Sequence, residues 1–137
     1  MGLVDRFQVG ASETMAIAVS QAMADAFAEL SGDNAPLHKD ESFAAGHGFE
    51  GRLVHGALVV ALLSRMVGTR FPGPESLWLQ CDVSFRNPCY APSQLRFHGV
   101  VVQQSEATSC IALKFNITDD RDRQIATAKT VHKVLES

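Results

Sequence analysis

Residues 57–63 read ALVVALL and form the longest apolar run in the chain. They lie in a stretch from His55 to Thr69 whose apolar side chains would cover nearly the whole circumference of a helix. A helix with this pattern is buried on more than one side. Seven apolar residues are far too few to cross a bilayer. We therefore expect a central helix that the other elements of a globular domain surround.

The hydrophobic period changes from helical to two after this helix. Beyond the Pro72–Pro74 segment, apolar and polar residues alternate along the chain, as they do in half-buried strands. Residues 86–92 interrupt the pattern with two prolines, which do not fit a central strand. The remaining segments predict four antiparallel strands near Leu77–Phe85, Leu95–Val101, Ile111–Ile117 and Gln124–Val134.

The segment before the central helix predicts one strand and two helices. Thr14–Val19 fits a first strand, and Ser20 is a suitable N-cap for the helical sequence QAMADAFAEL. Gly32 would end that helix, and Asp40 would open a short helix in DESFAAG. The residues expected on the apolar face of the first helix are Met23, Phe27 and Leu30. The layout is α+β, with an antiparallel sheet wrapped around one buried helix.

Length and composition limit the function classes. The 137 residues fit one domain, residues 1–137, and the net charge of −3 argues against a nucleic-acid-binding protein. The first ten residues show neither the basic start nor the apolar core of a signal peptide. Three cysteines form an odd set without a CxxC pair, which favours reduced thiols in the cytoplasm. We expect no membrane and no nucleic-acid partner.

Residues 31–38, SGDNAPLH, form a short loop that carries an acid and a histidine. Pro36 restricts its own φ and favours an extended Ala35, so the loop can hold Asp33 and His38 in a fixed relation. An imidazole and a carboxylate can share one water, which suits addition or removal of water across a C=C bond. Taken alone, an acid and a histidine near a helix end are more often caps and surface groups than catalytic groups. The chain's histidines lack recognised metal-ligand spacing, so we expect no metal site.

The sequence Val54-His55-Gly56 opens the central helix and supplies a second candidate element. Gly56 would lie in the first turn, where backbone N–H groups have no partner within the helix. A glycine there lets a carbonyl oxygen approach the N–H group, and the helix dipole favours negative charge. Gly56 is therefore a candidate oxyanion donor for a thioester enolate. The alternative is that it only permits close packing.

The run Phe27–Ser64 resembles the MaoC-like (R)-specific enoyl-CoA hydratases, or hydratase 2 family, whose signature is G-D-x-N-P-L-H followed by VHG. The resemblance continues weakly to the end of the chain. It implies a hotdog fold, in which an antiparallel sheet wraps a long central helix. By this resemblance Asp33 is the catalytic acid, His38 the catalytic histidine, Gly56 the donor to the thioester carbonyl, and Ser64 a serine near the active site.

The resemblance also implies an activity, namely syn addition of water to a trans-2-enoyl-CoA to give an (R)-3-hydroxyacyl-CoA. It implies no metal or organic cofactor, a thioester of CoA or of an acyl carrier protein as substrate, and a homodimer with the substrate arm along the subunit interface. One departure is that Ala35 stands where the signature has asparagine. This change concerns rate and substrate identity more than the class of reaction.

Two other functions stay open at this point. The first is a non-catalytic hotdog module that binds acyl-CoA or an acyl carrier protein. The second is a thioesterase on the same fold, because a fold alone does not define a reaction. Acyl length, pathway and direction of reaction are likewise open.

Overall fold

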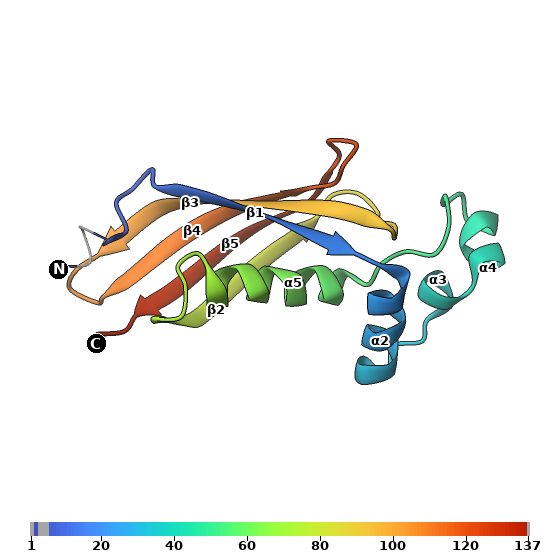
Figure 1. The fold of residues 1–137 in the computed structure, drawn as a ribbon, viewed down its shortest axis with the longest axis horizontal. Helices are drawn as coiled ribbons and strands as arrows, with labels where there is room; N and C mark the ends of the chain where they lie inside the picture. The colour runs from blue at the N-terminus through green and yellow to red at the C-terminus, as the bar shows by residue number, and fades with distance from the viewer. Residues whose placement is uncertain (1, 3–5, 137) are drawn as a thin grey trace.

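The computed structural model describes residue 2 and residues 6–136. One antiparallel sheet of five strands, in the order β1-β3-β4-β5-β2, curves over a single long helix (Figure 1). This is the α+β hotdog architecture that the sequence predicts. The elements are β1 (Ser12–Val19), α2 (Gln21–Ser31), α3 (Pro36–Lys39), α4 (Glu41–Gly46), α5 (Gly56–Thr69), β2 (Ser76–Phe85), β3 (Ser93–Ser105), β4 (Cys110–Thr118) and β5 (Gln124–Val134).

The predicted central helix is α5, which begins after its N-cap His55. Leu63 and Met66 are fully buried beneath the sheet, against an inner face that includes Phe97 of β3 and Leu113 of β4. Burying each such side chain contributes about 1.5–3 kcal/mol. The helix is not covered all round, however. One stripe faces solvent in this chain, and its residues are Ala57, Ala61, Ser64, Arg65 and Gly68.

Most element boundaries agree with the sequence prediction because local signals fix them. The hydroxyl of Ser20 accepts a hydrogen bond from the Met23 N–H and caps α2. Gly32 ends the same helix in the left-handed region, with φ 76°, where glycine has no steric penalty. Asp40 caps α4 by accepting from the Phe43 N–H. Strand β5 has the predicted bounds, and β1 begins two residues earlier than expected, at Ser12.

Two predicted patterns differ from the structure. Leu30 was expected on the buried face of α2, but it is 84% exposed, and the fully buried residues are Ala24 and Ala28. Met23 and Phe27, the other two residues predicted on this face, are half-buried and pack against the core. Helix α2 lies beyond the end of the sheet, which leaves Leu30 in solvent (Figure 1).

Strand β2 forms as predicted, but its predicted alternation in burial is wrong. The alternation places Leu77, Leu79 and Phe85 on the buried face, yet they are 53%, 49% and 54% exposed. Trp78 packs against the core instead, because β2 is an edge strand whose register shifts between Trp78 and Gln80.

The loop that carries Asp33 and His38 is also more ordered than expected. Residues 36–39 form the short helix α3, with Pro36 in its first turn and the extended Ala35 before it (φ −55°, ψ 142°). His38 therefore has a helical turn beneath it, where the sequence predicted a bare loop. Helices α2, α3 and α4 gather at the end of the molecule where α5 begins (Figure 1).

The sequence predicts neither a signal peptide nor a membrane-spanning segment. Part of the N-terminal segment used to argue against a signal peptide lies outside the described residues. Within the described residues, no helix is both long enough and apolar enough to span a bilayer. All three cysteines lie in the described part and are free thiols, with Cys81 exposed, Cys110 half-buried and Cys89 buried.

Candidate active site

The carboxylate of Asp33 is oriented by the backbone of its own loop. Its Oδ1 atom accepts a hydrogen bond from the Ala35 N–H at 3.2 Å, as in an Asx-turn. The N–H of Asp33 donates to the hydroxyl of Ser31 at 3.1 Å. These two bonds fix the residue just past the end of α2 and leave Oδ2 directed at His38. The Gly32 conformation that ends α2 is thus also what brings this acid to the site.

The imidazole of His38 is held by a backbone carbonyl in the segment before α5. Its Nδ1 lies 2.9 Å from the oxygen of Leu53, which can only accept, so Nδ1 carries the proton of the neutral ring. Nε2 then has a free lone pair. Leu53 is fixed in turn, because its N–H donates to the carbonyl of Leu37 at 2.9 Å and it forms an isolated β-bridge with Tyr90.

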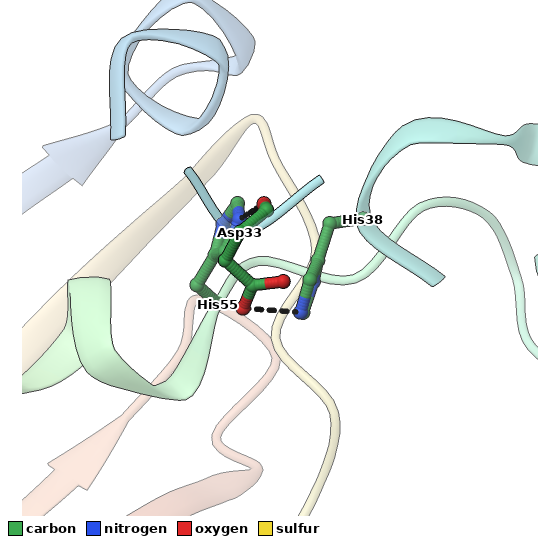
Figure 2. A group of neighbouring side chains, drawn as sticks. All are labelled: Asp33, His38 and His55. Atoms are coloured by element: carbon green, nitrogen blue, oxygen red, sulfur yellow. Dashed lines mark hydrogen bonds and ion pairs between the residues drawn. The ribbon is translucent and has the colours of Figure 1, made fainter. Parts of the chain in front are cut away.

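The two predicted catalytic groups meet across a short gap. His38 Nε2 and Asp33 Oδ2 are 3.6 Å apart, which is longer than a direct hydrogen bond (Figure 2). Asp33 is half exposed and His38 is partly exposed, so water reaches both. A basic nitrogen and a carboxylate oxygen that face one another at this distance can bind the same water molecule, and each can accept a proton from it.

A third side chain, His55, completes the cluster, and the sequence pattern assigns it no role. His55 is 2% exposed, and its Nε2–H donates to the main-chain carbonyl of Asp33 at 2.9 Å. Its ring stacks on that of His38, with centroids 3.9 Å apart and planes at 19° (Figure 2). The rings of Phe27 and His55 pack edge-to-face, with their centroids 5.1 Å apart. The one available signal was a histidine at the N-cap of the most apolar helix.

Asp33, His38 and His55 place potential metal-ligand atoms within 4.8 Å of one another, which is close enough for a metal centre to be considered. Each histidine already uses one ring nitrogen on a carbonyl oxygen. The two remaining nitrogens, on His38 and His55, belong to stacked, nearly parallel rings. A zinc ion binds in the plane of each imidazole at about 2.0–2.1 Å, and one ion cannot lie in both of these planes. The observed arrangement does not fit a metal.

Gly56 lies beside His38 on the wall of a pocket of about 420 Å³. Among the described residues no acceptor pairs with its backbone N–H, which belongs to the first turn of α5. A Cβ atom at this position would lie 2.9 Å from the ring of Phe85, so the glycine also permits close packing. Both sequence interpretations of Gly56 therefore have a structural basis. The rest of the pocket wall is mostly apolar and consists of Phe49, Leu53, Val54, Val59, Phe85, Arg86, Asn87, Pro88, Cys89 and Ile125.

Cys89 contributes shape rather than reactivity to this wall. Burial raises the pKa of its thiol to about 11, so the thiolate form that acts as a nucleophile is suppressed at neutral pH.

Ser64, the fourth residue of the predicted site, lies away from the cluster. It follows Gly56 by eight residues on α5, about 12 Å along the helix axis at 1.5 Å per residue. It is exposed and does not line the pocket. The structure brings Asp33, His38 and Gly56 together, and does not bring Ser64 to them within this chain.

Comparison with known proteins gives a consistent picture. The family model for the MaoC-like domain matches residues 8–120. A 3-hydroxybutyryl-CoA dehydratase of Methylorubrum extorquens is 37% identical over 81 residues, which cover 59% of this chain and 52% of that protein. An (R)-specific enoyl-CoA hydratase of Aeromonas caviae is 36% identical over 88 residues, covering 64% and 66%. The matched segments thus span about half to two thirds of the length of these relatives.

Solved structures extend the likeness over the whole fold. The structure of an (R)-hydratase from Aeromonas caviae superimposes with a TM-score of 0.87 at 30% identity, covering 93% of this chain and 97% of the other. The R-hydratase PhaJ1 from Pseudomonas aeruginosa gives a TM-score of 0.88 at 24% identity, covering 96% and 84%, and supports the fold.

Proposed function

The chain belongs to the MaoC-like domain family, and from that premise we propose that it is a hydro-lyase acting on enoyl thioesters. The proposed reaction is reversible addition of water to a trans-2-enoyl thioester of CoA or of an acyl carrier protein, giving the (R)-3-hydroxyacyl thioester. The observation that carries this proposal is the pair of His38 Nε2 and Asp33 Oδ2, 3.6 Å apart, beside the N–H of Gly56, which bonds to no described residue.

The proposed mechanism assigns one task to each group. One water lies between Asp33 and His38, and His38 Nε2 takes a proton from it as its oxygen bonds to C3 of the substrate. Electron density moves onto the thioester oxygen, where the Gly56 N–H and the start of the helix dipole stabilise the enolate. One such donor is worth ~3 kcal/mol in a transition state. A proton returned to C2 from the same pair completes the addition of H and OH.

The substrate and surroundings follow from the same chemistry. The reaction is redox-neutral and its charge accumulates on oxygen, so we expect no metal or organic cofactor. The apolar pocket wall next to His38 would take the acyl chain. Because the three cysteines are free thiols, we expect the protein to act in the cytoplasm. We also expect it to act as a homodimer.

A panel of trans-2-enoyl-CoA thioesters, from crotonyl-CoA to longer chains, tests the proposal. Hydration is followed by loss of the conjugated enoyl absorbance, and the product's configuration by a chiral assay. We expect turnover to an (R)-3-hydroxyacyl-CoA. Release of free CoA would instead indicate a thioesterase, and binding without turnover a non-catalytic module. Either result would overturn the proposed activity.

A further inference from the structure

His55 lies beneath both proposed catalytic groups but has no step in the reaction described above. It contacts each of them through a different part of its ring. The Nε2–H donates to the Asp33 carbonyl at 2.9 Å, and the ring face lies against His38 at a centroid distance of 3.9 Å (Figure 2). His55 is also the N-cap of α5, so the next residue, Gly56, supplies the proposed oxyanion donor.

The hydrogen bond to Asp33 shows which nitrogen of the buried ring carries a proton. Because a carbonyl oxygen only accepts, the proton of His55 is on Nε2. The other nitrogen, Nδ1, is buried and has no partner among the described residues. A second proton on Nδ1 would therefore be buried without an acceptor, which is costly. With its one proton on Nε2, the ring turns its π-face to His38.

An aromatic π-face suits the proton transfer proposed for His38. When His38 takes a proton from water, its cationic ring lies over the face of His55, which is a favourable arrangement for a cation and an aromatic ring. The same stack restricts rotation of His38 about its side chain, and the bond to Asp33 restricts the loop. Small misplacements of reacting groups, on the order of 1 Å, can cost about 100-fold in rate.

We propose that His55 is a positioning residue that holds Asp33, His38 and Gly56 in one catalytic arrangement. The inference rests on the proposed hydratase function. It assigns His55 two separable contributions, the donor to the Asp33 carbonyl and the flat surface under His38.

Two substitutions separate these contributions. In His55→Gln the amide nitrogen can still donate to the Asp33 carbonyl, but the aromatic face is lost. In His55→Phe the face is kept and the donor is lost. We expect each variant to lower kcat by about 10- to 100-fold. We expect KM to stay within about twofold, because His55 does not line the pocket.

The matched control is His47→Gln. His47 makes the same two kinds of contact away from the site, because its Nδ1 bonds to the Phe43 carbonyl at 2.8 Å and its ring lies 4.4 Å from the Phe43 ring. We expect wild-type kinetics for this control. Circular dichroism and thermal unfolding show whether each variant is folded at the assay temperature.

A double variant distinguishes positioning from a purely structural role. If His55 acts through His38, then adding His55→Gln to His38→Ala costs less than about threefold in the residual rate, since groups that act as a unit are not additive. A structural role would reduce activity by the same factor in both backgrounds. If both His55 variants unfold, Phe27→Leu replaces them, because it removes the aromatic ring that packs edge-to-face with His55. For this variant too we expect kcat to fall while KM stays near the wild-type value.

Wild-type kcat in either folded His55 variant, or an undiminished loss in the His38→Ala background, would overturn the inference while leaving the proposed function intact. Where Phe27→Leu replaces the His55 variants, wild-type kcat in the folded Phe27→Leu protein would also overturn the inference. A wild-type protein without activity on any enoyl thioester would overturn the proposed function itself, and with it this inference.

Discussion

Asp33 and His38 each hold one side of the proposed catalytic water, so neither should work alone. We predict that Asp33→Asn and His38→Ala each lower kcat by more than about 100-fold, the range general acid–base groups contribute. The double variant should be little worse than either single variant. Steady-state hydration of crotonyl-CoA measures the loss, with circular dichroism as the check of folding.

Two surface substitutions serve as matched controls for that pair. Asp82→Asn and His98→Ala alter the same residue types on exposed positions of β2 and β3, outside the pocket that His38 lines. Both should keep wild-type turnover. Near-normal activity in Asp33→Asn or in His38→Ala would refute the assignment of the catalytic pair.

Ala35 stands where the family signature has asparagine, and replacing it with asparagine measures the effect of this difference on kcat/KM. The neighbouring Asn34 does not replace the missing amide near the substrate, because its Nδ2 points back to the Gly32 carbonyl at 3.4 Å. Asparagine fits the extended backbone of Ala35, and one added hydrogen bond is worth about 0.5–1.5 kcal/mol. We predict that Ala35→Asn raises kcat/KM on crotonyl-CoA by less than about tenfold.

The contrary outcome for Ala35→Asn is a fall in kcat/KM on every enoyl-CoA tested. It would show that alanine here leaves room for an unusual substrate. Measuring wild type and variant on both short and long enoyl-CoAs separates the two cases.

At the scale of single residues, the sequence predicts the site through spacing and misses what depends on tertiary contact. Asp33 and His38 are predictable because one short loop connects them. His55 is 22 residues from Asp33, and its stacking on His38 depends on how the segment around Leu53 returns beside α3. No local pattern encodes that return.

Among the elements, the β4–β5 turn is tied to the segment that follows α4. Glu50 accepts hydrogen bonds from Arg121 and Arg123, each at 3.0 Å, and Arg123 also bonds to the buried Asp119 at 2.9 Å. Phe49, next to Glu50, is part of the pocket wall. The ion-pair cluster of Glu50, Asp119, Arg121 and Arg123 therefore stabilises one side of the proposed acyl pocket.

This cluster gives a pH-dependent prediction. Hydrogen bonds from Arg121 and then Arg123 hold the pKa of Glu50 below its ordinary value. A carboxylate of this kind stabilises the fold above its ordinary pKa, and the effect is lost as the pH falls through the lowered value. We predict that Glu50→Gln is less stable than wild type near neutral pH and that the difference shrinks as the pH falls below the ordinary pKa of the Glu50 carboxyl group and is lost once the pH is below its lowered pKa.

Urea unfolding of both proteins at several pH values between neutral and acid measures this difference. Glu106→Gln is the control, because Glu106 is an exposed residue that makes no ion pair with any residue described in the structure. A stability difference between wild type and Glu50→Gln that stays constant with pH would rule out the ionised pair as its source.

Sequence patterns predict where a helix or strand ends better than they predict which other elements pack beside it. Ser20, Gly32 and Asp40 fix helix ends through contacts within a few residues, so their roles were predictable. The apolar periodicity of α2 and β2 was read correctly as helix and strand. It could not say that Leu30 and Phe85 face solvent in a single chain, because that depends on which elements lie beside them.

At the scale of the whole molecule, β2 and α5 lie side by side and both leave apolar side chains exposed. The inner side of β2 exposes Cys81 and Phe85, and the exposed stripe of α5 includes Ala61 and Ser64. Strand β2 is also at an edge of the sheet, so within residues 6–136 no strand pairs with its outer row of N–H and C=O groups. Uncovered sheet edges and apolar side chains of this kind favour pairing with another chain.

We predict that a second copy of this chain covers the exposed side chains of β2 and α5 in a homodimer. Ala61→Arg should prevent it, because arginine suits an exposed helix position in the single chain but would place a long charged group in the interface. Light scattering at micromolar concentration should give about twice the 14.8 kDa of the chain for wild type and about the chain mass for the variant. Ala26→Arg, on the exposed side of α2, is the matched control and should remain dimeric. A wild-type monomer with full hydratase activity would contradict the prediction, since the exposed side chains of β2 and α5 would then need no partner.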